Sequence, residues 1–252
     1  MQARALEDPH PHAACGFSHA DVHCAFYFAF AGPGPWSLDA LGAPFTLRRA
    51  STPAMRGAAV ARHILDANGL QKVHLEVAPG TLTDHYDPRT HAIRLSLENA
   101  HDASVAAMAV SAHEAAHALQ DAADYAPLEL RTAMFPVVTA GARFGIPVAI
   151  LGSSLESQAM ILLGMLGYAG SILFHFVTLP VEFDASKRAL AELKRLGITR
   201  GEQEEAEART TLRAAAMTYV AGAASAGGYL LLVAIDLLRA FGLGRVAKGR
   251  AV

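Results

Sequence analysis

Long apolar stretches fill most of the second half of the chain. Residues 134–152 carry Arg143 as their one charged residue, and residues 158–181 carry no Asp, Glu, Lys or Arg. Residues 215–238 are also apolar, with Asp236 near their end. Since about 20 apolar residues are needed to cross a bilayer as a helix, the pattern predicts about three membrane helices. Core helices of a soluble α-protein are the alternative interpretation of the same stretches.

Shorter periodic segments follow one another in the first half. Apolar positions in residues 54–70 have helical spacing, and a short strand is expected at residues 72–78. Residues 81–97 read as a β-hairpin around the turn-forming pair Asp87 and Pro88. A helix is expected from about residue 103 to residue 125, and because it is apolar almost all round it should be buried in protein or lie against lipid.

The composition changes this picture in favour of a membrane. Hydrophobic residues make up 52% of the 252 residues and charged residues only 17%, with a mean hydropathy of +0.26. Soluble domains average about 25% charged residues. The net charge of −2 leaves no basic face for nucleic acid, so we expect no nucleic-acid partner. The charges gather instead at residues 187–213, in a helical pattern typical of a solvated face.

One short motif in the 103–125 helix carries candidate chemistry. His113, Glu114 and His117 form the pattern H-E-x-x-H. In a helix, residues four apart lie on one face, so the two imidazoles can bind the same zinc ion. Glu114 flanks that ion without ligating it and can take a proton from a bound water. Three polar residues falling together by chance in an alanine-rich helix are the alternative.

A catalytic zinc ion needs a third protein ligand, and Glu182 is the first candidate. It lies where the uncharged stretch ends and the charged stretch begins. If residues 134–152 and 158–181 form a hairpin of two spans, the chain returns to the side that it left. Glu182 then arrives at the membrane face where the helix ending near Tyr125 lies. Another distant His or Glu remains possible on this reasoning.

Five stretches, from about residue 55 to residue 240, resemble the YugP-type neutral zinc metallopeptidases, which are bacterial membrane proteins. The resemblance implies His113 and His117 as zinc ligands, Glu114 as the catalytic base and Glu182 as the third ligand, in the gluzincin manner. Related membrane gluzincins have an aspartate four residues after the ligand glutamate, where this chain has Ser186. The five stretches are LTDHYDP (82–88), RLS (94–96), SVAAMAVSAHEAAHALQ (104–120), TLPVEFDASKRAL (178–190) and LRAAAMTYVA (212–221).

The predicted fold class is therefore mainly α (α+β). We expect a membrane-associated zincin with a small β-hairpin or sheet, an H-E-x-x-H helix and about three apolar membrane helices. Its five parts are an irregular N-terminal extension, a zincin-like catalytic part, a membrane hairpin, a segment with the ligand glutamate and the charged helix, and a C-terminal membrane helix with its tail. These parts comprise residues 1–45, 46–133, 134–181, 182–214 and 215–252.

The predicted function is that of a membrane-embedded zinc endopeptidase with one Zn²⁺ ion. Zinc-activated water hydrolyses the peptide bond and Glu114 is the general base. The expected partners are a peptide or protein substrate and membrane lipid. The alternatives are a non-catalytic membrane scaffold or chaperone-like protein with a vestigial metal site, and a soluble helical binding protein.

Other residues receive weaker assignments. His85 and Tyr86 are candidates for stabilising an oxyanion or orienting the substrate, or else they only shape the turn beside Asp87 and Pro88. The strand from His91 to Leu97 is expected to offer its edge to a substrate peptide. His175 is expected to be a packed or interfacial residue. The His and Cys residues of the N-terminal extension could bind a metal ion. The favoured interpretation is that the extension is irregular and only has a biased composition.

The distribution of positive charge predicts the orientation in a bacterial inner membrane. The 153–157 link between the first two spans has no Lys or Arg, so the segment 185–213 and the site are expected on the cytoplasmic side of a multi-pass protein. The tail residues Arg245, Lys248 and Arg250 favour the opposite, since three spans would place them outside. The positive charges of the segment are Lys187, Arg188, Lys194, Arg195, Arg200, Arg209 and Arg213.

Overall fold

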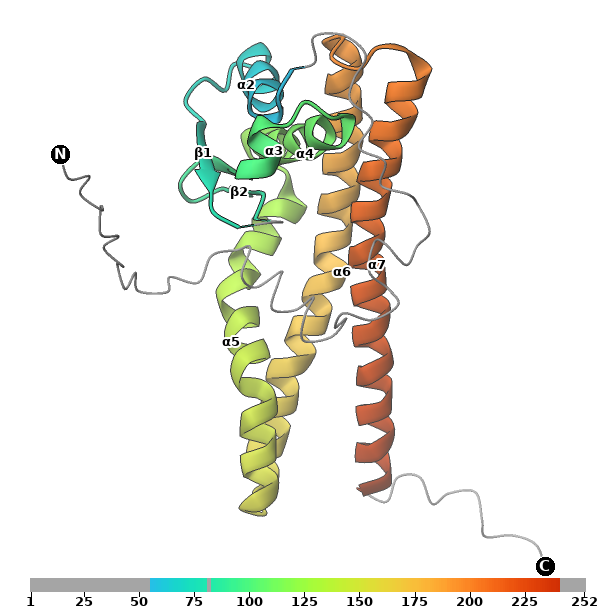
Figure 1. Ribbon diagram of the computed structural model, residues 1–252. Helices are drawn as coiled ribbons and strands as arrows, with labels where there is room; N and C mark the ends of the chain where they lie inside the picture. The colour runs from blue at the N-terminus through green and yellow to red at the C-terminus, as the bar shows by residue number, and fades with distance from the viewer. Residues whose placement is uncertain (1–54, 81–82, 241–252) are drawn as a thin grey trace, which may run out of the picture.

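The computed structural model describes residues 55–80 and 83–240, and it is mainly helical with one small sheet (Figure 1). The short elements gather at one end of three long helices, α5, α6 and α7. The N-terminal extension, with its His and Cys residues, lies outside the described residues. In chain order, the elements are α2 (Gly57–Ala67), β1 (His74–Ala78), β2 (His85–Asp87), β3 (Ala92–Ser96), α3 (Leu97–His101), α4 (Val105–Ala122), α5 (Ala126–Ser154), α6 (Gln158–Arg195) and α7 (Gly201–Ala240).

The sheet has the strand order β1-β3-β2. The predicted hairpin is present, because β2 and β3 pair antiparallel with Tyr86 opposite Ile93. The other side of β3 pairs with β1 in parallel, in a register that places Leu75 opposite Ile93. Both edges of β3 are therefore occupied, and the prediction that the strand His91–Leu97 offers an edge to substrate is wrong. Within the described sheet, the outer strands are β1 and β2.

Helix α4 is buried inside the protein, which is one of the two surroundings that its apolar pattern predicts. Ser104 caps its first turn by accepting a hydrogen bond from the Ala107 backbone N–H at 3.2 Å. Small side chains then cover several faces of the helix, so α2, the sheet and the long helices can all approach it closely. Val60 and Ile64 of α2 belong to the same buried cluster as Ala112 of α4. Alanine therefore builds a dense core around the helix that carries the motif.

Helices α5 and α6 form a long antiparallel hairpin, joined at Leu155–Ser157. Glycines hold the two backbones together. A Cβ atom at Gly141 would overlap with the carbonyl oxygen of Gly167, and one at Gly164 would overlap with that of Gly145. This close packing of small residues is typical of helix pairs in membranes, where approach of the backbones replaces the hydrophobic driving force.

Two helices of the described chain, α5 and α6, are long and apolar enough to cross a membrane. Their most apolar windows are only 17% and 19% buried, whereas the core helix of a soluble protein would be mostly buried. The third membrane helix, expected at residues 215–238, is not among the candidate spans of the described chain. The exposed apolar side chains of the hairpin include Val137, Phe144, Ile150, Leu162, Leu163, Leu166, Leu173 and Phe176.

The charged stretch at residues 187–213 differs from the prediction of one helical pattern. Helix α6 continues without a break to Arg195, and α7 starts at Gly201. Between them the chain turns through Gly197, whose φ of +63° favours glycine. The charges therefore lie on the two ends of a helical hairpin. Helices α6 and α7 also run without interruption across the expected boundaries at 181/182 and 214/215.

The glycine contacts predict which substitutions the hairpin tolerates. Gly164→Ala should destabilise the folded protein by about 1–3 kcal/mol, because the new methyl group meets backbone atoms of α5. Gly170→Ala, on the same helix, is the matched control, since nothing lies within 4 Å of a Cβ atom there. Thermal unfolding of the detergent-solubilised variants measures both effects. Equal midpoints for the two variants would contradict the close packing of α5 and α6.

Candidate metal centre

Helix α4 presents two imidazoles to the same side. His113 and His117 are four residues apart, and their ring centroids lie 4.7 Å from each other. Both side chains are buried, with exposed fractions of 11% and 7%. Two histidines on one face of a buried helix form half of a metal-binding site.

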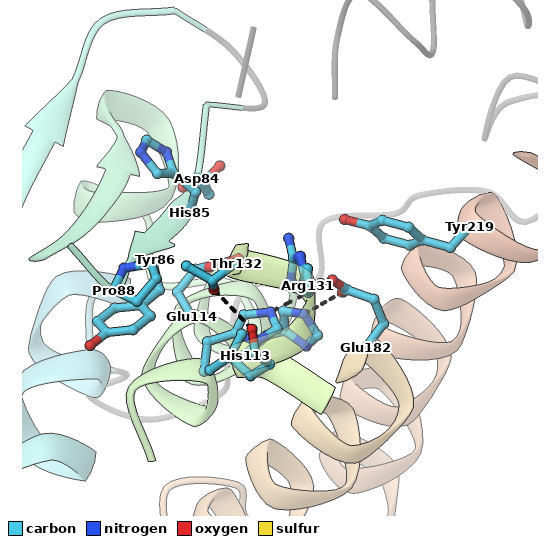
Figure 2. Close-up of a pocket in the computed structure, with 12 residues that line it drawn as sticks. Asp84, His85, Tyr86, Pro88, His113, Glu114, Arg131, Thr132, Glu182 and Tyr219 are labelled. Carbon is cyan, nitrogen blue, oxygen red and sulfur yellow. Dashed lines mark hydrogen bonds and ion pairs between the residues drawn. The ribbon is translucent and has the colours of Figure 1, made fainter. Parts of the chain in front are cut away.

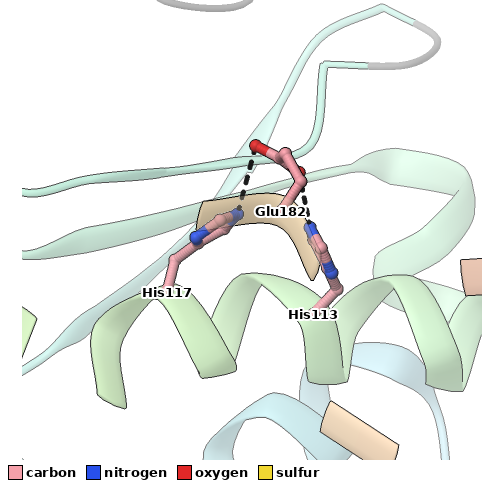
Figure 3. Close-up of side chains that lie close together, drawn as sticks. All are labelled: His113, His117 and Glu182. Carbon is pink, nitrogen blue, oxygen red and sulfur yellow. Dashed lines mark hydrogen bonds and ion pairs between the residues drawn. The ribbon is translucent and has the colours of Figure 1, made fainter. Parts of the chain in front are cut away.

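Glu182 reaches the same point from α6 (Figure 3). Its Oε2 lies 3.1 Å from Nε2 of His113, and its Oε1 lies 3.9 Å from Nε2 of His117. Donor atoms of the three side chains all lie within 4.8 Å of one another. Of the described residues, these three are the ones whose His, Cys, Asp or Glu donors cluster in this way. The sequence predicted that the hairpin of two long helices would bring Glu182 back to the helix that carries the histidines, and the structure has this arrangement.

Arg131 of α5 is the charged partner of this carboxylate. Its Nη1 donates to Glu182 Oε1 at 3.2 Å, and only 11% of its side chain is exposed. A buried carboxylate without positive partners would be costly, and the guanidinium offsets part of that cost. The sequence reasoning did not select Arg131, because the contact depends on how α5 packs beside α6.

The Nδ1 atom of each imidazole, on the side of the ring away from Glu182, also has a polar partner. Nδ1 of His117 lies 2.9 Å from Oε1 of Gln120, and the Gln120 amide donates to Val181 O and to Asp184 Oδ2 at 2.9 and 2.8 Å. The Gln120 oxygen can only accept, so His117 carries its proton on Nδ1 and turns the Nε2 lone pair toward Glu182. Such partners fix the tautomer and orientation of a metal-binding histidine.

His113 is held more weakly on its far side. Ser186 lies there, with its Oγ 3.4 Å from Nδ1 of the ring. At this position the resemblance to membrane gluzincins implies an aspartate, and the serine makes only this long contact. Of the two residues that orient the histidines, only Ser186 was considered from the sequence. Gln120, on the next turn after His117, was missed.

Burial and charge set the protonation of the motif residues. Burial is the main factor that lowers the pKa of His117 to about 3. Burial has the same tendency at His113, but the hydrogen bond and charge of Glu182 outweigh it and raise the pKa of that ring. At Glu114, burial raises the pKa to about 7, with the positive charge of His113 acting against the increase. A neutral His117 is the form that binds a metal ion.

The three side chains line one pocket (Figure 2). One side of it comes from β2 and the residues around it, and the other side from α5, α6 and α7. Glu114 lies in the pocket beside the histidines and is 8% exposed. The full lining is Asp84, His85, Tyr86, Pro88, His113, Glu114, His117, Leu128, Arg131, Thr132, Glu182 and Tyr219.

Three other residues selected from the sequence lie outside the cluster of His113, His117 and Glu182. Tyr86 lines the pocket, but its hydroxyl donates to Asp121 Oδ2 at 2.7 Å. His85 also lines the pocket, and its Nδ1 lies 2.7 Å from the Thr83 carbonyl oxygen. Roles for these two residues at an oxyanion remain predictions. His175 packs near Gly222 of α7, outside the three-residue cluster.

Comparison with known proteins gives the class to which this geometry belongs. Residues 46–237 match the model of a family described as "Putative neutral zinc metallopeptidase". The match covers most of the chain, so the chain belongs to this family. The "Putative membrane protease YugP" of Bacillus subtilis (strain 168) is 42% identical over 167 residues, which are 66% of this chain and 74% of the relative. No solved structure matches the chain.

The donor set fits the zinc ion that the family name implies. Two imidazole nitrogens and one carboxylate oxygen are the ligands of known catalytic zinc sites. Two ligand atoms about 2.1 Å from a tetrahedral ion lie about 3.4 Å apart. The observed separations of 3.1 and 3.9 Å fall on either side of that value. The site can therefore accept the ion with small adjustments of the side chains.

Metal analysis tests the role of Glu182. Glu182→Gln should lower the affinity for zinc at least about 100-fold, because a neutral amide is a much poorer ligand than a carboxylate. Glu192→Gln is the matched control on α6, since that carboxylate pairs with Arg195 and Asn68 away from the pocket. Competition with a chelator, read by mass spectrometry of the bound metal, measures both variants. Wild-type affinity in Glu182→Gln would exclude this glutamate as a ligand.

Proposed function

We propose that this chain is a membrane-embedded zinc-dependent endopeptidase. The observation that carries the proposal is the meeting of His113 and His117 with Glu182, with Glu114 on the helix that bears both histidines. Membership of the metallopeptidase family and the identity with a membrane protease support it. A peptide or protein is the proposed substrate, and lipid is the proposed surrounding of the hairpin.

The metal ligands of the proposed enzyme are His113, His117 and Glu182, which would hold one zinc ion. Bound zinc polarises a carbonyl oxygen and lowers the pKa of water to about 7. The protein contributes the orientation of its ligands. Gln120 fixes the ring of His117, and Arg131 holds the carboxylate of Glu182 in the pocket.

Glu114 is the proposed general base. Its carboxylate takes a proton from the attacking water and then delivers it to the nitrogen of the departing amine. It can do so because α4 places it in the same pocket as the ligand histidines. Its position inside a largely buried site also keeps bulk water from competing for the proton.

The exposed apolar surface of the α5–α6 hairpin supports insertion into a bilayer. From Gln158 to Glu182, α6 rises through 24 residues, or about 36 Å at 1.5 Å per residue. The hydrocarbon core of a bilayer is about 30 Å thick. A hairpin that crosses it with Leu155–Ser157 at the far side thus leaves the metal ligands just outside the near face. We propose residues 215–238 of α7 as a third span.

The near face is proposed to be the cytoplasmic face of a bacterial cell membrane. The support is the excess of Lys and Arg between residues 185 and 213, against none in the 153–157 link. In Figure 1, the α6–α7 turn and the small sheet lie at the same end of the long helices, opposite the α5–α6 turn. The pocket and the positive charge would therefore share one side of the membrane.

Loss of the base tests the catalytic proposal. Glu114→Gln should retain zinc and fold but lose hydrolysis of casein by at least about 100-fold, because general-base catalysis contributes about 10²–10⁴. Glu129→Gln, an exposed residue in the first turn of α5, should cleave like the wild type. Undiminished cleavage by a zinc-loaded Glu114→Gln protein would exclude this mechanism. Absence of activity in the wild type would favour a non-catalytic scaffold.

Cysteine labelling tests the orientation. In a background without Cys15 and Cys24, a cysteine at Ser154 should react with a membrane-impermeant maleimide in intact cells, and one at Gln203 should not. Both side chains are exposed, so burial does not limit the reaction. Opening the cells should make the second site reactive as well. The reverse pattern in intact cells would contradict a cytoplasmic site.

A further inference from the structure

Hydrolysis at this site would require a donor for the oxygen of the scissile carbonyl, which gains negative charge when water adds to the carbon. Two hydroxyl groups of the pocket are directed elsewhere. Tyr86 donates to Asp121, and Thr132 donates to the Leu128 carbonyl oxygen at 2.8 Å within its own helix. The guanidinium of Arg131 is bound to Glu182.

Tyr219 brings a third hydroxyl to the pocket, from α7. Figure 2 shows its side chain on the side opposite β2, with the hydroxyl directed over Glu182 and Arg131. The charges of Glu182, Arg131 and Glu114 act on this hydroxyl. The phenol therefore lies within the electrostatic field of the cluster, although it comes from a different helix.

The sequence of α7 explains why a tyrosine can reach this place. Leu212, Ala216 and Ala223 are buried, and Tyr219 shares their stripe at positions i, i+4, i+7 and i+11. Helix α7 packs against α4 and α6, and alanine is small enough to allow close approach of helices. Tyr219 is half-buried, and its side chain lines the pocket.

We propose that Tyr219 is a further catalytic residue, whose hydroxyl donates a hydrogen bond to the carbonyl oxygen of the scissile peptide as that oxygen becomes an oxyanion. The inference rests on the proposed peptidase function. Water forms the new C–O bond, the π-electron pair moves onto the carbonyl oxygen, and Glu114 takes the water proton. When the C–N bond breaks, that pair re-forms the carbonyl and Glu114 protonates the amine. Tyr219 keeps its own proton throughout.

The substitution that isolates this hydroxyl is Tyr219→Phe, made in the full chain in detergent. Removal of one oxyanion donor lowers kcat by about 10²–10³ in other hydrolases. A bound zinc ion would share the charge, so we expect a fall in kcat of about 10–100-fold with KM changed less than twofold. Thr218→Val is the matched control, because the Thr218 hydroxyl donates to Ala215 O within α7. The substrate is a quenched fluorescent casein peptide that the wild type cleaves.

A second measurement separates catalysis from structure. A phosphinic peptide has tetrahedral oxygens that imitate the oxyanion, so Tyr219→Phe should bind it at least about 10-fold more weakly. Zinc content and the unfolding midpoint should equal those of the wild type. Unchanged kcat, unchanged phosphinic-peptide affinity, or loss of zinc would each overturn the role of Tyr219. An inactive wild type would overturn the peptidase proposal itself, so the two failures are distinguishable.

Discussion

The carboxylate of Glu182 is the interaction on which the rest of the structure depends. It is 3% exposed and is surrounded by His113 and His117 from α4 and by Arg131 from α5. A charge at that depth is stable only when its partners are in place. The three helices must therefore pack in one register before the site exists. Alanines on α4 and glycines between α5 and α6 supply that register, because each allows close approach of the backbones.

The features that could be predicted from the sequence are those set by short-range spacing. The two histidines share a face because they are one helical turn apart, and the hairpin of β2 and β3 follows from the turn at Asp87 and Pro88. The prediction of Glu182 as the third ligand required the additional assumption that a membrane hairpin returns to the side on which it started. Arg131, Gln120 and Tyr219 could not be selected, since nothing in their local sequence shows which helix they will meet. Gln120 is one turn from His117, but its orientation depends on the carbonyl of Val181 and the carboxylate of Asp184.

Two kinds of apolar helix in this chain show why composition alone does not determine surroundings. Helix α4 is buried in protein and rich in alanine, which packs against several neighbours at short distance. Helices α5 and α6 carry leucine, isoleucine and phenylalanine on surfaces that other parts of the described chain do not cover. Large apolar side chains suit lipid tails, whereas small ones suit a crowded protein interior. The break at Gly197 was missed for a related reason, because charged residues on both sides of it continue the same helical pattern.

In the proposed membrane arrangement, the uninterrupted course of α6 would connect the depth of the helix in the bilayer to the geometry of the site. The helix that carries the exposed apolar surface also carries Glu182, with no loop between them. A shift of α6 along its axis by one residue is about 1.5 Å, which is comparable to the difference between a hydrogen bond and no contact at all. If the α5–α6 hairpin crosses a bilayer as proposed, a bilayer thicker or thinner than the hairpin would shift Glu182 along the axis of α6. The thickness of that proposed membrane would then affect the alignment of three buried side chains.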